Sequence, residues 1–329
     1  MTDFYSGKKV LVTGGTGFVG THFVEALVAA GANVRVPVHR RTPAIKNEKV
    51  EYISGNLESL EDCIRCCEGV DYVFHAAGAV SAAGTTVANP MSAISTNLIL
   101  TARILEAAMI KEIKRILVFS SGTTAYPLAD YPIKEEEMWT DHPPEIYFGY
   151  GWMRRYIEIL SRFVSSKSSI GVAICRPTAV YGRHDDFDPV TSHVIPALIR
   201  RAVSKENPFV VWGTGDEIRD FLHVTDLVRG CLVLLEKHAV CDPVNIGYGK
   251  TTSIKEIVEI ILNAAKHDKV EVQFDDSKPT TIPKRMVETI KAKKILGFEP
   301  EISLSKGLED TFEWYLKQEN KDSLVKAGA

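Results

Sequence analysis

The sequence lacks a strong charge of either sign. Its 39 lysine and arginine residues are set against 42 aspartate and glutamate residues, which gives a formal net charge of -3. Without a basic excess, the bulk composition does not favour nucleic acid or an anionic membrane surface as a partner. An anionic substrate would have to be bound by a local basic pocket.

Signals for export and for membrane insertion are also missing. The N-terminus enters an apolar run, KKVLVT, almost at once and lacks the charged, then apolar, then small-residue order of a signal peptide. No uninterrupted apolar run approaches the roughly 20 residues of a spanning helix. We therefore expect a cytoplasmic protein that does not contact a membrane.

Cysteines at zinc spacing are absent as well. Cys63, Cys66 and Cys67 lie at positions i, i+3 and i+4 of a helix-like segment, so they share one face. No second pair of cysteines or histidines stands at the spacing of a zinc site. We predict buried thiols in a reducing compartment and no metal.

What the first half does contain is a regular alternation of apolar runs and helical patterns. Near-continuous apolar strands separated by helices indicate a parallel sheet covered on both faces, so the predicted fold is an α/β doubly wound parallel sheet. Strands are expected at residues 8–13, 33–38, 50–53, 72–77, 115–121 and 171–177, and helices at about 18–30, 60–67, 91–109 and 149–166.

The pattern changes after Pro177, with no serine- or glycine-rich linker. Loops, short strands and helices are mixed there, which predicts a smaller lobe over residues 178–329 beside a first lobe over residues 1–177. The two are interleaved, and some later segments return to the first sheet. Further helices are expected at about 195–203, 225–237, 254–265 and 304–317, and strands at 208–212 and 270–274.

Three glycines stand between the first strand and the first helix. In VLVTGGTGFVG, Gly14, Gly17 and Gly20 allow a tight turn, the approach of a diphosphate and close packing of helix on sheet. The free N–H groups at the helix start then bind the negative charge. This predicts a dinucleotide site, so the first lobe is a Rossmann NAD(P)-binding lobe and the second is mainly substrate-binding.

An acidic residue is missing from the end of the second strand, where NAD sites usually carry one for the ribose hydroxyls. Val38 stands there, followed by His39, Arg40 and Arg41. A 2′-phosphate could pair with a guanidinium at this position, so we favour NADP over NAD. The alternative is a surface loop that happens to be basic. Asn56, where a carboxylate is commoner, is expected beside the adenine.

Several motifs together resemble one family over nearly the whole chain. They are TGGTGFVG, FHAAG, FSSGTTAYP, YGWMRRYIE, CRPTAVYG, RDFLHVTDLVRG, VNIGYG and AKKILGFEP. The sequence resembles the extended short-chain dehydrogenases/reductases of the nucleotide-sugar epimerase, reductase and dehydratase group. It is most similar to GDP-fucose synthase-like (GDP-4-keto-6-deoxymannose epimerase-reductase) members. The resemblance implies a nucleotide-diphosphate sugar as substrate and a homodimer formed through the two long helices.

The resemblance also implies which residues contact the cofactor. They lie in the glycine loop, at the strand ends and in the active tyrosine motif: Gly14, Thr16, Gly17, Phe18, Val19, Gly20, His39, Arg40, Arg41, Asn56, Leu57, Ala76, Ala77, Gly78, Ser120, Tyr150, Arg154, Pro177 and Val180.

A lysine is missing where the family chemistry uses one. In the family, a tyrosine moves the hydroxyl proton while a hydride passes between sugar C4 and the nicotinamide, and a lysine stands four residues later. Here the pair is Tyr150 and Arg154. A phenol ionises usefully near neutrality only if its anion is stabilised by roughly 4 kcal/mol. Arg154 keeps the charge but is bulkier, planar and never gives up its proton. We expect an active but altered site; a crippled enzyme, or a merely packed Tyr150, is the alternative.

A hydroxyl is missing as well, because Gly122 occupies the family's usual Ser or Thr position. Thr124 is the expected substitute and Thr123 the runner-up. Dehydratases carry an Asp–Glu pair at these two positions, so a 4,6-dehydratase is a weaker alternative. In the fucose-synthase pattern a cysteine at position 124 and a histidine share acid/base duty. The histidine is kept as His193 and the cysteine is not, which disfavours double epimerisation. His193 could also be a structural residue at a helix start.

Cations are needed for the two substrate phosphates. The resemblance implies Arg201 and Arg219 as this clamp, with Trp212 nearby. The overall prediction is an NAD(P)-dependent epimerase or reductase with Tyr150 as acid/base at C4 of a GDP-linked sugar. A non-catalytic NAD(P)-binding sensor is the alternative from a different class, and it would be favoured if Arg154 pointed away from Tyr150.

Overall fold

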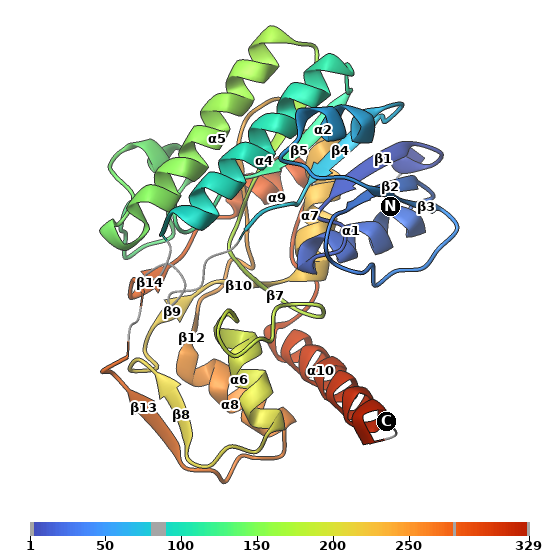
Figure 1. The fold of residues 1–329 in the computed structure, drawn as a ribbon. Coiled ribbons are helices and arrows are strands. Elements are labelled where there is room, and N and C mark those ends of the chain that lie inside the picture. The colour runs from blue at the N-terminus through green and yellow to red at the C-terminus, as the bar shows by residue number, and fades with distance from the viewer. Residues whose placement is uncertain (1–2, 80–89, 279–280, 328–329) are drawn as a thin grey trace.

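The main sheet has the predicted architecture in a computed structural model of the protein, which describes residues 3–79, 90–278 and 281–327 (Figure 1). Seven strands pair in the order β3-β2-β1-β4-β5-β6-β11, and every pair is parallel. The prediction of a doubly wound parallel sheet is confirmed. The strands are β1 (Lys9–Thr13), β2 (Asn33–Val38), β3 (Val50–Ser54), β4 (Tyr72–His75), β5 (Arg115–Phe119), β6 (Gly171–Pro177) and β11 (Val244–Ile246).

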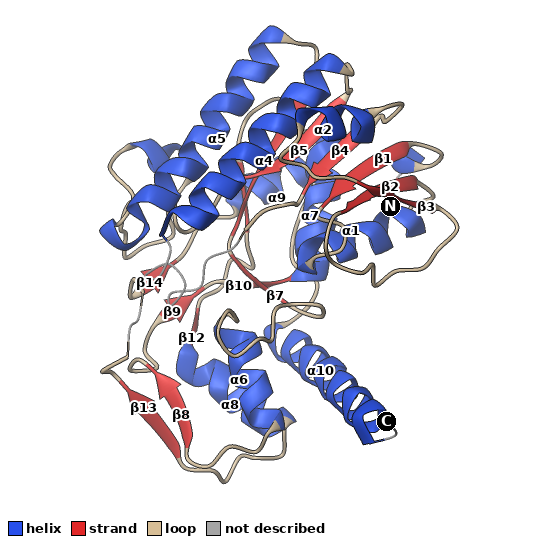
Figure 2. Ribbon diagram, viewed as in Figure 1, coloured by secondary structure: helices blue, strands red, loops and turns tan. Residues whose placement is uncertain are grey.

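Helices cover both faces of this sheet (Figures 1 and 2). The two layers follow from the alternation of side chains along each strand. In β1, Val10 and Val12 pack into one core cluster and Leu11 into the other. One face carries α2 (Leu60–Cys67), α4 (Pro90–Ile110) and α5 (Phe148–Lys167), and the other carries α1 (Phe18–Ala29), α7 (Val224–Lys237) and α9 (Ile290–Leu296).

The strand order reverses between β1 and β4, because the chain runs outward from β1 to β3 and then returns on the other side. In sheets of this kind, ligands bind beyond the carboxyl ends of the strands at such a switch point. The glycine loop follows β1, so the sheet places it at the predicted binding edge.

The second lobe lies beyond that edge and has a core of its own (Figure 1). It contains α6 (Val194–Val203), α8 (Ile254–Ala264), α10 (Leu304–Ala327), β8 (Phe209–Trp212) with β13 (Val272–Asp275), and the small sheet of β12 (Thr252–Ser253), β9 (Ile218–Arg219) and β14 (Lys284–Arg285). Strands β7 (Ala179–Tyr181) and β10 (Phe221–His223) pair where the chain leaves the first lobe. We keep the boundary at Pro177 as a proposal, with α7, β11 and α9 returning to the main sheet.

The predicted helices match the observed ones closely, with one exception. The last helix was expected to end near Lys317, but α10 continues to Ala327. Its second half has no regular apolar pattern to reveal a helix. Glutamine, glutamate and lysine are nevertheless good helix formers, so the helix can continue without a buried face.

One helix has an unexpected composition. Within α4, residues Met91–Ile110 have a mean hydropathy of 1.4, so by length and composition alone this helix could cross a membrane. The sequence analysis did not identify it, because Arg103 and Glu106 interrupt the apolar run. In the fold it packs between α2 and α5 (Figure 1).

The three clustered cysteines are buried, as predicted. Cys63, Cys66 and Cys67 lie on α2 with no exposed surface and pack into the core between α2, α4 and the sheet. Burial raises the pKa of the Cys63 and Cys67 thiols to about 12. Such thiols are poor nucleophiles and behave as small apolar side chains.

The junction of the lobes contains a buried histidine that caps a helix. His223 ends β10 and accepts a hydrogen bond from the backbone N–H of Thr225 at 3.3 Å, in the first turn of α7. Its Nε2 atom is buried and has no partner among the described residues. Burial, together with the neighbouring His22 and Arg183, lowers the pKa of His223 to about 4, against smaller opposing effects of Asp226 and Asp310.

We predict that His223 makes the fold less stable as the pH falls. Because its folded pKa is lowered, its contribution is complete above the unfolded value near 6.5 and is lost as the pH drops toward 4. Asparagine caps a helix without titrating. When the pH is lowered from 6.5 to 5, the free energy of unfolding of His223→Asn should therefore rise by about 2 kcal/mol relative to that of the native protein. Urea denaturation at both pH values measures this, and a difference that does not change with pH would contradict it.

Candidate functional site

The glycine loop fits a cofactor diphosphate because its backbone leaves no room for side chains. Gly14 has a φ of +69°, and a Cβ there would lie 2.7 Å from the carbonyl oxygen of Ala76. A Cβ on Gly20 would collide with the carbonyl of Gly14. The loop therefore closes against the start of α1 and against the chain just beyond β4, at the switch point.

A buried histidine fixes the strand ends beneath this loop. His75, the last residue of β4, bonds through Nδ1 to the Thr13 hydroxyl at 2.8 Å and through Nε2 to the Thr101 hydroxyl at 3.2 Å. Thr13 also accepts the N–H of Ala77 at 3.1 Å. Burial, with a smaller effect of the Arg154 charge, lowers the pKa of His75 to about 3, so the ring is neutral. The sequence analysis assigned no role to His75.

The side chains of His39, Arg40 and Arg41 after β2 are exposed, and none forms an ion pair within the part of the chain that the structure describes. Arg41 lies nearest the loop, with its Nη1 atom 4.0 Å from the position that a Cβ would take on Gly17. Asn56, predicted to lie beside the adenine, accepts the N–H of Glu58 with its side chain at 3.1 Å, and Leu57, predicted to contact the cofactor, is packed into the core.

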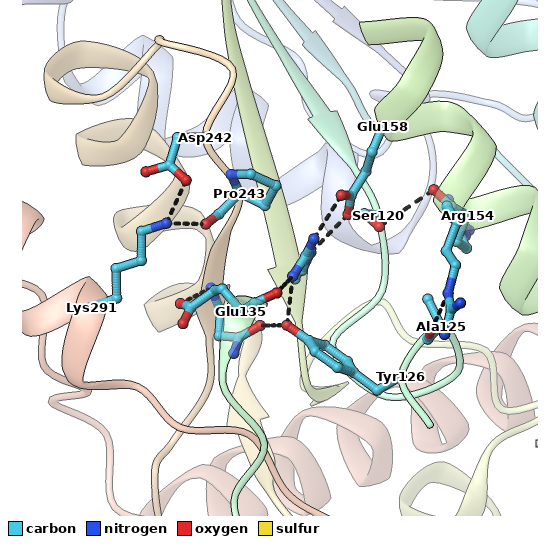
Figure 3. Close-up of polar contacts among 12 residues, drawn as sticks. Ser120, Ala125, Tyr126, Glu135, Arg154, Glu158, Asp242, Pro243 and Lys291 are labelled. Carbon is cyan, nitrogen blue, oxygen red and sulfur yellow. Dashed lines mark hydrogen bonds and ion pairs between the residues drawn. The ribbon is translucent and has the colours of Figure 1, made fainter. Parts of the chain in front are cut away.

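Arg154 points at Tyr150. The two residues lie in the first turns of α5, and Arg154 Nη2 donates to the Tyr150 hydroxyl at 2.5 Å. Arg154 Nη1 donates to the carbonyl of Phe119 at 3.2 Å, at the end of β5. The Ser120 hydroxyl lies 3.5 Å from the Arg154 carbonyl (Figure 3). The guanidinium of Arg154 therefore bridges the carboxyl end of β5 and the hydroxyl of Tyr150.

The chain after β5 explains why a hydroxyl is missing at Gly122. A Cβ on Gly122 would lie 2.6 Å from the carbonyl oxygen of Pro177 and 2.9 Å from that of Arg176. Gly122 also donates its own N–H to Pro177 at 2.9 Å, which holds the chain in this place. A serine or threonine does not fit this backbone.

Ser121 organises the two threonines that follow. Its oxygen accepts the Thr124 hydroxyl at 2.7 Å and the N–H groups of Thr124 and Thr123 at 3.0 and 3.3 Å. The carbonyl of Thr124 packs against Gly151, where any side chain would collide with it. The structure therefore brings Thr124 next to the residue that follows Tyr150.

A buried polar network holds this loop and α5 in place (Figure 3). Arg176 of β6 forms two hydrogen bonds of 2.7 Å to the carboxylate of Glu158 on α5, and both side chains are almost fully buried. Its Nη1 atom donates to the Tyr126 hydroxyl and to the Glu135 carbonyl, both at 2.7 Å. Tyr126 in turn donates to Asn245 of β11 at 2.7 Å.

Of the residues expected in the substrate lobe, His193 and Trp212 remain open to solvent. His193 is the N-cap residue of α6, and its side chain does not cap the helix. It is accessible to water yet has protein on most sides; this desolvation lowers its pKa, against a smaller opposing effect of Asp186. Trp212 ends β8 and is 55% exposed.

Arg201, predicted to form the phosphate clamp with Arg219, lies in the last turn of α6, whereas Arg219 ends β9. Its Nε atom donates to Glu206 at 2.6 Å, and its guanidinium lies 5.2 Å from the Phe209 ring centroid. Glu206 is close enough in sequence to hold this side chain at the end of α6 through Nε. Arg201 acts in this structure as a local ion-pair partner.

A different arginine stands beside Arg219. Strands β9 and β14 pair in parallel with Arg219 opposite Arg285. Arg219 is largely occupied, because it donates to the Pro283 carbonyl at 2.9 Å and to the Thr281 hydroxyl at 3.0 Å. Arg285 has its Nε and Nη2 atoms buried without a partner among the described residues, and it lies 4.3 Å above the Tyr147 ring. The sequence analysis missed Arg285, because one cation in a two-residue strand gives no pattern.

Two cavities lie away from these residues. One of about 450 Å³ lies against residues 266–270, and one of about 320 Å³ lies between α8 and β13. Neither is lined by Tyr150 or by the glycine loop. The candidate site is therefore defined by the strand ends and by converging side chains.

Comparison with known proteins agrees with this arrangement. Residues 10–247 match the model of the NAD dependent epimerase/dehydratase family. The chain belongs to this family. It is accordingly an NAD(P)-dependent enzyme.

Named relatives cover almost the whole chain. A probable GDP-L-fucose synthase 1 of Oryza sativa subsp. japonica is 28% identical over 94% of this chain and 93% of its own length. A putative UDP-glucose 4-epimerase of Methanocaldococcus jannaschii is 30% identical over 95% of this chain and 99% of its own. The crystal structure of a UDP-glucose 4-epimerase with UDP-glucose, from Thermotoga maritima, superposes with a TM-score of 0.84 and is 27% identical, covering 94% of this chain and 99% of that one.

Proposed function

We propose that the protein is a nucleotide-sugar epimerase or reductase in which Tyr150 is the acid/base at sugar C4. One observation carries this proposal: Arg154, which stands in the place of the family's lysine, donates directly to the Tyr150 hydroxyl at 2.5 Å. The sensor alternative required the opposite orientation. The names of the relatives support a nucleotide sugar as substrate.

Each residue has a defined task in this proposal. The glycine loop would hold the diphosphate of the dinucleotide, whose nicotinamide would supply the hydride chemistry at C4. The Tyr150 oxygen takes the C4 hydroxyl proton, or returns it to the C4 keto oxygen. Arg154 stabilises the phenolate as a fixed donor; it cannot accept a proton, so the proton does not pass through it. The Thr124 hydroxyl donates to Ser121, which leaves its lone pairs to accept from a sugar hydroxyl.

The same residues limit the range of reactions. Neither Thr123 nor Thr124 has the acidity of the dehydratase pair, so we do not propose 4,6-dehydration. With threonine in place of cysteine, His193 is left as an auxiliary group that binds the sugar or acts at one carbon. Because a GDP-L-fucose synthase is among the relatives, we take a GDP-linked sugar as the first candidate and a UDP-linked sugar as the second.

The substrate diphosphate is proposed to bind between the lobes, beside Arg219 and Arg285. Arg285 offers two buried N–H donors that have no protein partner in the described chain. Arg219 lies next to it on the paired strand and adds its charge. Two neighbouring guanidiniums suit the charge and geometry of a diphosphate. Trp212 remains a proposed contact at the edge of the pocket.

We predict that Tyr150→Phe abolishes turnover, with a loss of at least about 100-fold, because the acid/base is removed. Arg154→Lys should leave activity equal or higher, since the charge stays in place, and Arg154→Met should lower it. Tyr131→Phe is the matched control for losing a phenol. Absorbance at 340 nm is followed with GDP- and UDP-linked sugars and their 4-keto forms, and NMR of the products reveals an epimerase that recycles its cofactor. If the native protein turns over none of them, the sensor replaces this proposal.

For the cofactor we propose NADP, because Arg41 lies beside the glycine loop without an ion-pair partner in the described chain. The family establishes NAD(P) dependence only. Arg41→Ser should weaken NADPH binding by about 10- to 100-fold, which is the loss of a charge-assisted contact to the 2′-phosphate. NADH binding to the same variant is the internal control and should change little. Fluorescence titration measures both; equal losses, or tighter NADH binding by the native protein, would rule out NADP.

We also propose a homodimer formed through α4 and α5, which lie side by side (Figure 1). Large apolar side chains are exposed along both helices: Met91, Ile99, Ile110, Phe148, Tyr156, Ile159 and Phe163. A second copy would bury the same face of both subunits by two-fold symmetry, as homodimers usually do.

Charge placed on this face should separate the subunits. Phe163→Glu changes a side chain that is 55% exposed, and we expect it to yield a monomer by light scattering. Val240→Glu is the control, because Val240 is exposed outside α4 and α5 and should leave the dimer intact. A native protein that is monomeric at micromolar concentration would refute the proposal.

A further inference from the structure

Tyr147 joins the two lobes at the start of the helix that carries Tyr150. It is the last residue of the short helical turn η3 (Glu145–Tyr147), and its N–H donates to the Pro144 carbonyl at 2.7 Å. α5 begins at the next residue. Its half-buried ring lies under the guanidinium of Arg285, which comes from β14 in the second lobe, with Cζ 4.3 Å from the ring centroid.

One edge of the guanidinium has no hydrogen-bond partner among the described residues. A cation above an aromatic ring is attracted through its flat face, whereas guanidinium hydrogen bonds lie in its plane. The unpartnered atoms of Arg285 are Nε and Nη2. Their N–H groups point the same way along one edge and form a two-pronged donor that matches two oxygens of one phosphate group.

The free state of this arginine is unfavourable without a ligand. A buried cation whose donors are unpaired has lost hydration without gaining hydrogen bonds. Burial lowers the pKa of Arg285 to about 10, so it remains charged at neutral pH. Its neighbour Arg219 already donates to Pro283 and Thr281, whereas Nε and Nη2 of Arg285 have no partner in the part of the chain that the structure describes.

We propose that Tyr147 is a positioning residue that holds Arg285 against its ring so that Nε and Nη2 engage one phosphate of the substrate diphosphate. This inference rests on the proposed function, in which the substrate is a nucleotide-diphosphate sugar. Because Tyr147 directly precedes α5, the contact also fixes the bound phosphate relative to Tyr150, three residues later. Tyr147 itself does not touch the reacting atoms.

The experiment measures the binding of GDP and UDP by calorimetry, with NADPH at saturation so that the glycine loop is already occupied. Tyr147→Leu removes the ring and should weaken binding of the preferred nucleoside diphosphate about tenfold, whereas Tyr147→Phe keeps the ring and should stay within about twofold. Tyr147→Met is the second ringless variant should the leucine variant not fold. Phe4→Leu removes the ring that lies 5.2 Å from Arg115, at the opposite edge of the sheet, and should have no effect.

A double-mutant cycle separates positioning from a merely structural role. In an Arg285→Met background, Tyr147→Leu should cause no further loss, because it acts only through the arginine. The corresponding nucleoside should bind equally to the native protein and to Tyr147→Leu. If the native protein binds neither GDP nor UDP, the proposed substrate class fails and this inference with it. If it binds them but Tyr147→Leu is unchanged, or causes the same loss without Arg285, the positioning role is refuted while the proposed function stands.

Discussion

The buried ion pair between Arg176 and Glu158 is the interaction on which the candidate site depends. It joins the end of β6 to the middle of α5, and Arg176 extends it to Tyr126 and to the carbonyl of Glu135. Removing one partner of such a pair typically costs about 3–5 kcal/mol, because the other charge is left buried and unpaired. This contact fixes the position of α5 against the sheet and, through Tyr126 and Glu135, the path of the loop after β5.

The two departures from the family pattern both follow from that framework. At Gly122 the carbonyls of Arg176 and Pro177 come so close that no side chain fits, and the hydroxyl that we propose in its place, that of Thr124, lies two residues further along the loop. On α5, an arginine is long enough to reach the Tyr150 hydroxyl and the Phe119 carbonyl at once. A guanidinium in this place holds the phenol more rigidly than an ammonium would. Because it stays protonated, it does not take part in proton transfer.

The sequence predicted what is periodic or local. The sheet, the long helices and the glycine loop have repeating patterns, and Tyr150 and Arg154 are one helical turn apart, so their contact could be foreseen. Arg285, His75 and the pairing of Arg201 with Glu206 could not. The first lies in a two-residue strand, the second has partners on β1 and α4, and the third depends on which way the chain turns after α6. These contacts depend on the tertiary structure and leave no periodic pattern in the sequence.

Charge distribution links the two ligand sites. The chain has a net charge of -3, yet Arg41 lies beside the glycine loop, Arg154 beside Tyr150 and Arg285 beside Arg219 on the paired strand of the second lobe. Low-dielectric walls strengthen such a local field, so it attracts anions although the whole protein repels them weakly. The cofactor and the proposed substrate both carry a diphosphate. Nε and Nη2 of Arg285 are buried without a partner among the described residues, so a phosphate bound there would supply the acceptors that these donors lack, and its binding would stabilise the fold around the proposed site.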